Sequence, residues 1–262
     1  TPESGPTTAS RQTFVTGNAA LLAARDLRQH LLSAVSAYRN IPTDQILLTP
    51  QGAVCSPDPQ GQFDKMAMRN LNWQQLASLL EHTSTGRSIR RAYIAPQTYE
   101  LGEGNPIHFA FSFSAQAVQI EVSLESGEIR VLQVISAHDA GRVLNPLGFQ
   151  GQVEGGVVMG LGHALMEEFK VDDGIIQTDR MARYHIPTMQ DNPKVISIIE
   201  EHPISSGPFG AKGVGEIVSI PTPPAITNAL YNAIGLRVDS LPVHATDVLA
   251  YLRTIKQSKV AD

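Results

Sequence analysis

Residues 118–135, Val-Gln-Ile-Glu-Val-Ser-Leu-Glu-Ser-Gly-Glu-Ile-Arg-Val-Leu-Gln-Val-Ile, decide the fold class of this chain. Apolar and polar side chains alternate as far as Leu124, which is the period of a strand with one face toward a core and one toward water. Residues 125–128 are turn formers, and the apolar pattern returns at Ile129. The stretch therefore predicts an antiparallel hairpin.

Helical patterns flank this hairpin on both sides. Asn72 can cap a helix and Gln75 can complete a capping box with it, while Thr246 can cap a last helix that runs through Leu252. Because helices and hairpins are intermixed without a strand–helix–strand rhythm, the sequence predicts an α+β fold of mixed helices and antiparallel hairpins. The other elements expected are helices over residues 18–35, 151–168 and 222–234, and a strand over residues 194–199.

Composition excludes several classes of protein. The chain has 262 residues, a length typical of one large domain or two small ones, and 42% of them are hydrophobic, which is enough for a packed core. Its net charge of −5 argues against a nucleic-acid binder, which needs a basic surface. No apolar run reaches the length of a membrane span and no secretory signal opens the chain, so we expect a cytoplasmic protein without a membrane span.

Cys55 is the single cysteine of the chain. One thiol allows no internal disulfide and no four-thiolate iron–sulfur or zinc site built by this chain alone. The chain begins at Thr1 rather than at a methionine, and we expect it to be a processed chain or a part of something longer.

Glycines gather in the helix expected after the hairpin. Residues 150–162, Gln-Gly-Gln-Val-Glu-Gly-Gly-Val-Val-Met-Gly-Leu-Gly, hold five glycines, and each one inside a helix costs about 0.5–1 kcal/mol relative to alanine. Such a helix has something pressed close to its backbone. One interpretation is tight packing against another element, and the other is a bulky ligand near the helix N-terminus, where free N–H groups favour an anion.

A second glycine-rich segment, residues 207–216, ends in a carboxylate. It does not match the Walker phosphate loop, because it contains no Gly-Lys-Ser/Thr, and its glycine spacing is wrong for the dinucleotide fingerprint. Glu216 is either a solvated loop residue or a general base, held in a loop whose glycines let the backbone approach a ligand.

Two further patterns carry a weaker signal. The segment from Gly5 to Thr13 is rich in hydroxyl side chains near a helix start, and it is either an ordinary loop or a hydrogen-bonding site for an anionic ligand. His138 and Asp139, near the end of the hairpin, are interpreted as a structural turn pair.

Taken together, these segments resemble the molybdenum-binding subunit of the xanthine oxidase/aldehyde oxidase family of molybdenum hydroxylases. The resemblance runs over the whole chain but covers only the C-terminal part of that subunit. It implies one molybdopterin-binding region over residues 1–262, with two lobes that meet near residues 100–106. The segments that carry it are Gly5 to Thr13, His138-Asp-Ala-Gly-Arg-Val-Leu-Asn-Pro146, Gly151-Gln-Val-Glu-Gly-Gly156 and Lys212-Gly-Val-Gly-Glu216.

The resemblance also assigns roles to individual residues. Glu216 becomes the catalytic base, while the role of Lys212 stays open. A base that works near neutral pH benefits from a raised pKa, which partial burial beside an anionic cofactor would supply. The residues implied to contact the cofactor are Ala9 and Ser10, whose backbone would lie near molybdenum, and Gln12, Thr13, Gln152 and Glu154.

The implied activity is hydroxylation of an electron-poor carbon in an N-heterocycle, purine-like or nicotinate-like, or in an aldehyde, with water as the oxygen source. The implied cofactor is molybdenum–molybdopterin, for which the cytosine dinucleotide form is one option. The rest of the molybdenum subunit, a [2Fe–2S] cluster and FAD are expected on other segments or partner chains. The alternative is a module that holds the cofactor or assists assembly and does not turn over without its partners.

Overall fold

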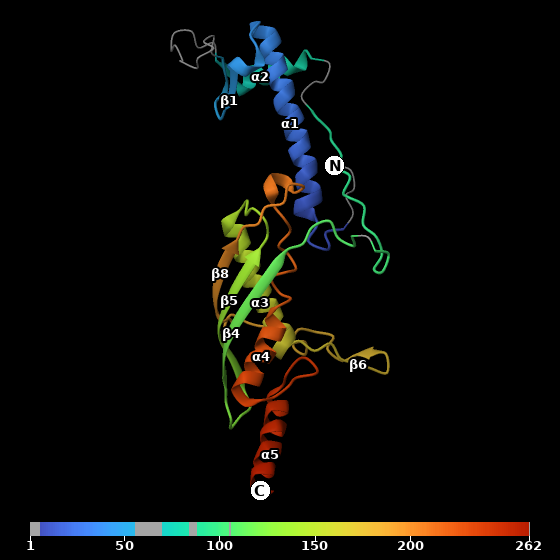
Figure 1. The fold of residues 1–262 in the computed structure, drawn as a ribbon, viewed down its shortest axis with the longest axis vertical. Coiled ribbons are helices and arrows are strands. Elements are labelled where there is room, and N and C mark those ends of the chain that lie inside the picture. The colour runs from blue at the N-terminus through green and yellow to red at the C-terminus, as the bar shows by residue number, and fades with distance from the viewer. Residues whose placement is uncertain (1–5, 56–69, 84–87, 105, 262) are drawn as a thin grey trace. The chain divides into compact units, whose positions relative to one another are not determined.

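A computed structural model of the chain describes residues 6–55, 70–83, 88–104 and 106–261 (Figure 1). Gly5, the first residue of the hydroxyl-rich segment, lies outside the described residues. The chain divides into two compact units. The first unit comprises Thr1–Phe14 and Gln97–Asp262, and the second comprises Val15–Pro96. The single molybdopterin-binding region expected over residues 1–262 stays a prediction.

The second unit contains a long helix, a small sheet and a short helix. Helix α1 spans Gln12–Arg39, so the helix expected over residues 18–35 is confirmed and is longer at both ends. Leu32 and Val35 of α1 are buried in one apolar cluster with Leu76 of the short helix. The other elements are the short 3₁₀ helix η1 (Thr43–Gln45), strands β1 (Ile46–Thr49), β2 (Gly52–Cys55) and β3 (Leu71–Asn72), and helix α2 (Trp73–Glu81).

The capping box expected before α2 is confirmed. Asn72 Oδ1 accepts a hydrogen bond from the Gln75 backbone N–H, and Gln75 Oε1 accepts one from the Asn72 backbone N–H, each at 2.9 Å. These two bonds satisfy N–H groups that the helix itself leaves unpaired. The sequence analysis missed the antiparallel strands β1 and β2, because four-residue strands are too short to show a clear alternation.

The first unit is built on a three-stranded sheet in the order β4-β5-β8. Strands β4 (Phe113–Val122) and β5 (Ile129–Asp139) pair antiparallel, which confirms the predicted hairpin. Strand β8 (Lys194–Glu200) pairs parallel with β5, so the sheet is mixed. A parallel neighbour needs a crossover connection, and helix α3 lies in the segment that joins these two strands.

Helices α3 (Pro146–Leu165) and α4 (Thr222–Ile234) pack on one face of this sheet (Figure 1). Val134 of β5, Val157 of α3 and Ile226 of α4 are fully buried together. The helix expected over residues 151–168 begins five residues earlier, because Asn145 caps it and Pro146 occupies its first turn. The α+β fold predicted from the sequence is confirmed.

The remaining elements of the first unit are short, apart from the last helix. Helix α5 spans Ala245–Ala261, so the last helix expected through Leu252 is confirmed and continues beyond it, but Thr246 lies inside the helix and is not its cap. The His244 backbone N–H, just before the helix, donates to Asp247 Oδ2 at 2.8 Å. The others are the hairpin strands β6 (Val171–Asp172) and β7 (Ile175–Ile176) and the 3₁₀ helix η2 (Pro208–Gly210).

Membrane spans were expected to be absent. Among the residues that the structure describes, no helix combines the length and the apolar character that crossing a bilayer requires.

The glycines of α3 serve two different purposes. A Cβ on Gly156 would lie 2.2 Å from Val218 Cγ2, and one on Gly160 would lie 2.5 Å from Thr222 Cβ, so tight helix packing is confirmed at these positions. In contrast, a Cβ on Gly151 or Gly155 would meet nothing within 4 Å. This part of the helix therefore leaves its backbone open.

The two kinds of glycine predict opposite effects on stability. Gly156→Ala overpacks the contact with Val218 and is expected to lower the free energy of unfolding by about 1–3 kcal/mol. Gly151→Ala is expected to raise it by about 0.5–1 kcal/mol, because alanine favours the helix and meets no neighbour. Denaturant unfolding of both variants measures the difference, and equal effects would contradict this account of α3.

Candidate functional site

The loop that carries Glu216 lies directly against the segment around Ser10. The Glu216 backbone N–H donates a hydrogen bond to Ser10 Oγ at 3.0 Å, between residues 206 positions apart in the chain. A Cβ on Gly213 would lie 1.8 Å from the Ser10 carbonyl oxygen, so only glycine allows this approach. Two of the segments singled out in the sequence therefore lie side by side.

The Ser10 segment has a strained backbone. Ala9 and Ser10 both have a φ of 50°, in the left-handed region that residues with a side chain rarely adopt. Ala9 is exposed and Ser10 is half-buried. Gln12 lies at the first position of α1, and its Nε2 donates to Thr7 Oγ1 at 3.3 Å. Left-handed residues of this kind cost about 1–3 kcal/mol each, and they gather at ligand-binding and catalytic sites.

A cavity of about 330 Å³ lies where three of the sequence segments meet. Thr13 follows the strained segment, Gln152 belongs to the first half of α3, and Val214 belongs to the Glu216 loop. The remaining lining residues come from the end of β5, the start of α3 and the same loop, namely Ala140, Arg142, Val143, Leu144, Asn145, Gly148, Phe149, Ala211 and Lys212.

The N-terminal end of α3 contributes the polar part of this cavity. Asn145 Oδ1 accepts a hydrogen bond from the Gly148 backbone N–H at 2.9 Å, which fixes where the helix begins. The partial positive charge at a helix N-terminus favours an anion, and Arg142 adds a full charge. Glu154 lies on the exposed side of the helix and outside the cavity lining, and its Oε1 accepts from Gln150 Nε2 at 2.8 Å.

These residues fit an anionic pterin cofactor. Thr13 and Gln152 offer neutral hydroxyl and amide donors, and Arg142 offers a cation. Gly151 and Gly155 leave the adjacent helix backbone without side chains, so that a flat group can lie against it. Within the described ranges, no three His, Cys, Asp or Glu side chains cluster closely enough to hold a metal ion directly.

The side chain of Glu216, the expected base, is exposed in this chain. Its partial burial was expected beside the bound cofactor, so that burial stays a prediction. Gly215 beside it carries no side chain, and the nearest atom that a Cβ there would meet is Ser10 Oγ, at 3.5 Å.

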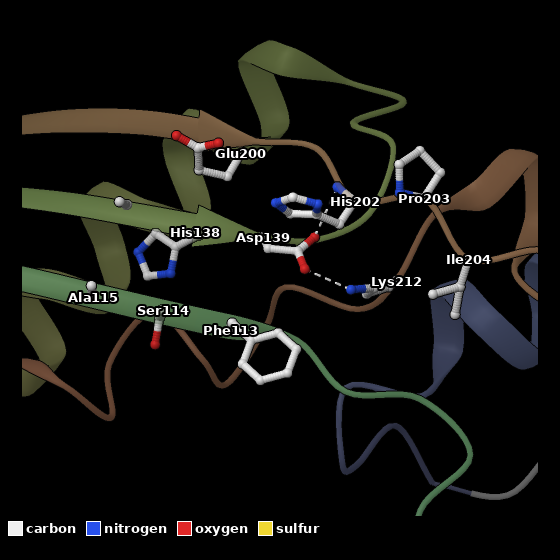
Figure 2. Close-up of a pocket in the computed structure, with 11 residues that line it drawn as sticks. Phe113, Ser114, Ala115, His138, Asp139, Glu200, His202, Pro203, Ile204 and Lys212 are labelled. Carbon is white, nitrogen blue, oxygen red and sulfur yellow. Dashed lines mark hydrogen bonds and ion pairs between the residues drawn. The ribbon is translucent and has the colours of Figure 1, made fainter.

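A buried ion pair that the sequence does not predict lies beside this loop. Lys212 Nζ lies 2.7 Å from Asp139 Oδ2, and the two side chains are 4% and 6% exposed (Figure 2). Burial by itself would raise the pKa of the Asp139 carboxyl, but hydrogen bonds from Lys212, Gly141 and His202 and the charge of Lys212 together hold that pKa below its usual value. A lysine in a glycine-rich loop gives no sign in the sequence that it is buried.

The pair lines a second cavity of about 610 Å³ at the end of the sheet (Figure 2). His138 and Asp139 belong to β5, although Asp139 also begins a turn, since its Oδ1 accepts from the Gly141 N–H at 2.8 Å. Burial lowers the pKa of His138, which favours the neutral ring, and its Nε2 lies 2.6 Å from Ser136 Oγ. The turn-pair interpretation is therefore incomplete, because both side chains are buried in the structure.

Comparison with known proteins relates this chain to molybdenum-binding subunits of known enzymes. The sequence model of the molybdopterin cofactor-binding domain family matches residues 1–193, which include the Ser10 segment and α3. The chain is 39% identical over 142 residues to a probable xanthine dehydrogenase subunit of Bacillus subtilis, covering 54% of this chain and 19% of that protein. It is also 39% identical over 176 residues to the aldehyde oxidoreductase molybdenum-binding subunit PaoC of Escherichia coli, covering 66% and 23%.

Solved structures agree with the fold. Aldehyde oxidoreductase from Desulfovibrio desulfuricans is 27% identical with a TM-score of 0.68, over 95% of this chain and 24% of that one. A Cu,Mo-CO dehydrogenase, 20% identical, gives a TM-score of 0.78 over 97% of this chain and 31% of that one, and supports the fold alone. The chain thus spans about a fifth to a third of the length of the proteins it matches.

Proposed function

Because the chain belongs to the molybdopterin cofactor-binding domain family of molybdenum hydroxylases, we propose that it supplies the base-bearing part of such an enzyme's active site. One observation carries the proposal: the Glu216 amide is bonded to Ser10 Oγ. That contact joins the loop that carries a carboxylate to the strained segment that leads to Thr13 and the cavity of about 330 Å³. The anchor fixes the backbone from which the exposed Glu216 side chain projects.

In this proposal, Thr13, Gln152 and Arg142 hold the cofactor, and the backbone of Ala9 and Ser10 lies beside its metal. Gln12 and Glu154, which the sequence also predicts to contact the cofactor, are not among the lining residues of the cavity and stay proposed contacts. The cofactor, when bound, supplies the two-electron redox chemistry. Glu216 removes, through a carboxylate oxygen, the proton of the water-derived hydroxyl that attacks the substrate carbon. Ser10 Oγ holds the Glu216 backbone in place for that transfer.

The substrate is proposed to be an N-heterocycle, purine-like or nicotinate-like, or an aldehyde. Relatives named as xanthine dehydrogenase and aldehyde oxidoreductase subunits support both substrate classes. We further propose partner segments that carry the rest of the molybdenum subunit, a [2Fe–2S] cluster and FAD. One relative is named as the gamma subunit of a 6-hydroxypseudooxynicotine dehydrogenase complex. The cytosine dinucleotide form of the cofactor and the cytoplasmic location stay predictions.

Metal analysis tests this division of the site. The chain purified alone is expected to hold little or no molybdenum, because these residues form one side of a cofactor site. The material purified with its partner chains is expected to hold molybdenum and to bleach when purines, nicotinate or aldehydes are added. Stoichiometric molybdenum in the isolated chain would contradict a shared site. A loaded complex that no such substrate bleaches would favour the alternative, a cofactor-holding module.

A further inference from the structure

Lys212, four residues before Glu216 in the chain, forms a buried ion pair with Asp139. Lys212 Nζ and Asp139 Oδ2 are 2.7 Å apart, and almost no solvent reaches either side chain. Figure 2 shows Lys212 extending toward the carboxylate at the end of β5. Lys212 also lines the cavity of about 330 Å³, but the function proposed above gives neither residue a role.

Asp139 is held from three directions. Besides Lys212, its Oδ1 accepts hydrogen bonds from the Gly141 backbone N–H at 2.8 Å and from the His202 backbone N–H at 3.3 Å. The Lys212 backbone N–H in turn donates to the Ala140 carbonyl at 2.9 Å. The pair therefore fixes the Lys212 segment, by side chain and by backbone, to the rigid end of a central strand.

From this fixed point the chain enters the Glu216 loop directly. Three residues separate Lys212 from Glu216, and two of them, Gly213 and Gly215, are glycines with a soft backbone. Beyond Lys212, Ser112 Oγ donates to the Gly213 carbonyl at 3.1 Å, and the Glu216 amide donates to Ser10 Oγ at 3.0 Å. The Ser219 backbone N–H and Oγ each donate to the Glu216 carbonyl at 3.2 Å. Because glycine restricts the backbone least, a firm anchor at the start of this segment helps Glu216 at its end to keep one position.

We propose that the buried Lys212–Asp139 ion pair positions the loop that carries Glu216, so that both are positioning residues for the base; this rests on the function proposed above. Stability alone does not explain the pair. The free-energy cost of desolvating two charges offsets most of their attraction. Well-packed apolar residues at the same two positions would stabilise the fold equally well. A buried ion pair does give one fixed geometry, because both charged groups must meet.

The test removes both charges together in the assembled, molybdenum-loaded protein. The double variant D139N/K212M keeps an acceptor oxygen for Gly141 and His202 and leaves no buried charge unpaired, so it avoids the instability of either single variant. Hydrogen–deuterium exchange at the amides of residues 213–216 is expected to rise about tenfold or more. We also expect kcat to fall by about 10–100-fold with little change in KM, because misplacing a catalytic group by about 1 Å is that costly.

A matched control uses a surface ion pair outside the site. Lys170 Nζ lies 2.9 Å from Glu168 Oε2, with side chains 57% and 35% exposed, and E168Q/K170M is expected to change neither the exchange of the loop nor kcat. Wild-type exchange at residues 213–216 in a folded D139N/K212M protein would overturn the proposal. Hydrogen–deuterium exchange measures the order of the loop without depending on catalysis. Normal turnover of E216Q would show that Glu216 is not the base, and this outcome is distinguishable from a failure of the positioning proposal.

Discussion

Glu216→Gln is expected to lower the turnover of the assembled, molybdenum-loaded enzyme by about 10²–10⁴-fold, the usual cost of losing a general base. Glutamine has nearly the same size and keeps the backbone N–H that bonds to Ser10 Oγ, so the loop keeps its place. The neutral amide cannot accept the proton. Steady-state kinetics measure the turnover, and metal analysis measures separately whether the variant still holds molybdenum.

The control for this substitution is Glu125→Gln, in the exposed turn between β4 and β5. It removes the same charge at a position away from the site, and turnover is expected to stay at the wild-type value. Near-normal turnover of E216Q with a full complement of molybdenum would refute the role of Glu216 as base.

Gly213→Ala is expected to be the second most damaging change in this loop. The new Cβ would lie 1.8 Å from the Ser10 carbonyl oxygen and 2.7 Å from Ser10 Cβ. Both neighbours are held close to the backbone and cannot swing away, so the loop and the Ser10 segment must separate. We expect a loss of about 1–3 kcal/mol in stability from overpacking. A fall in turnover of about 100-fold is expected from the displaced base.

Gly215→Ala provides the matched comparison two residues further on. The nearest atom to its Cβ would be Ser10 Oγ at 3.5 Å, an ordinary van der Waals contact. Its melting temperature is expected to stay close to that of the wild type, whereas that of G213A falls. Equal melting temperatures for the two variants would show that the close contact between Gly213 and Ser10 does not exist in solution.

Much of the fold follows from local patterns in the sequence. The hairpin of β4 and β5 is visible because its strands are long and alternate cleanly, and α2 is visible because Asn72 and Gln75 form a capping box. The parallel pairing of β8 is not visible, because a short apolar strand carries no information about the direction of its neighbour. Register across a crossover is a tertiary property.

The candidate site was predictable as a set of segments but not as a geometry. Glycine patterns singled out α3 and the Glu216 loop, and the structure explains Gly156 by packing and Gly151 by an open backbone. The burial of Lys212 and Asp139 depends on residues far apart in the chain. Likewise, nothing in Ala9 or Ser10 indicates a left-handed backbone, since side chains of these types disfavour it.

An experimental structure of the assembled, molybdenum-loaded enzyme tests the central claim most directly. We expect the Glu216 carboxylate to face the metal, with its amide still bonded to Ser10 Oγ and with Gln152 against the pterin. A carboxylate that points into bulk solvent, away from both Ser10 and Gln152, would contradict the assignment of this chain as the base-bearing part of the site.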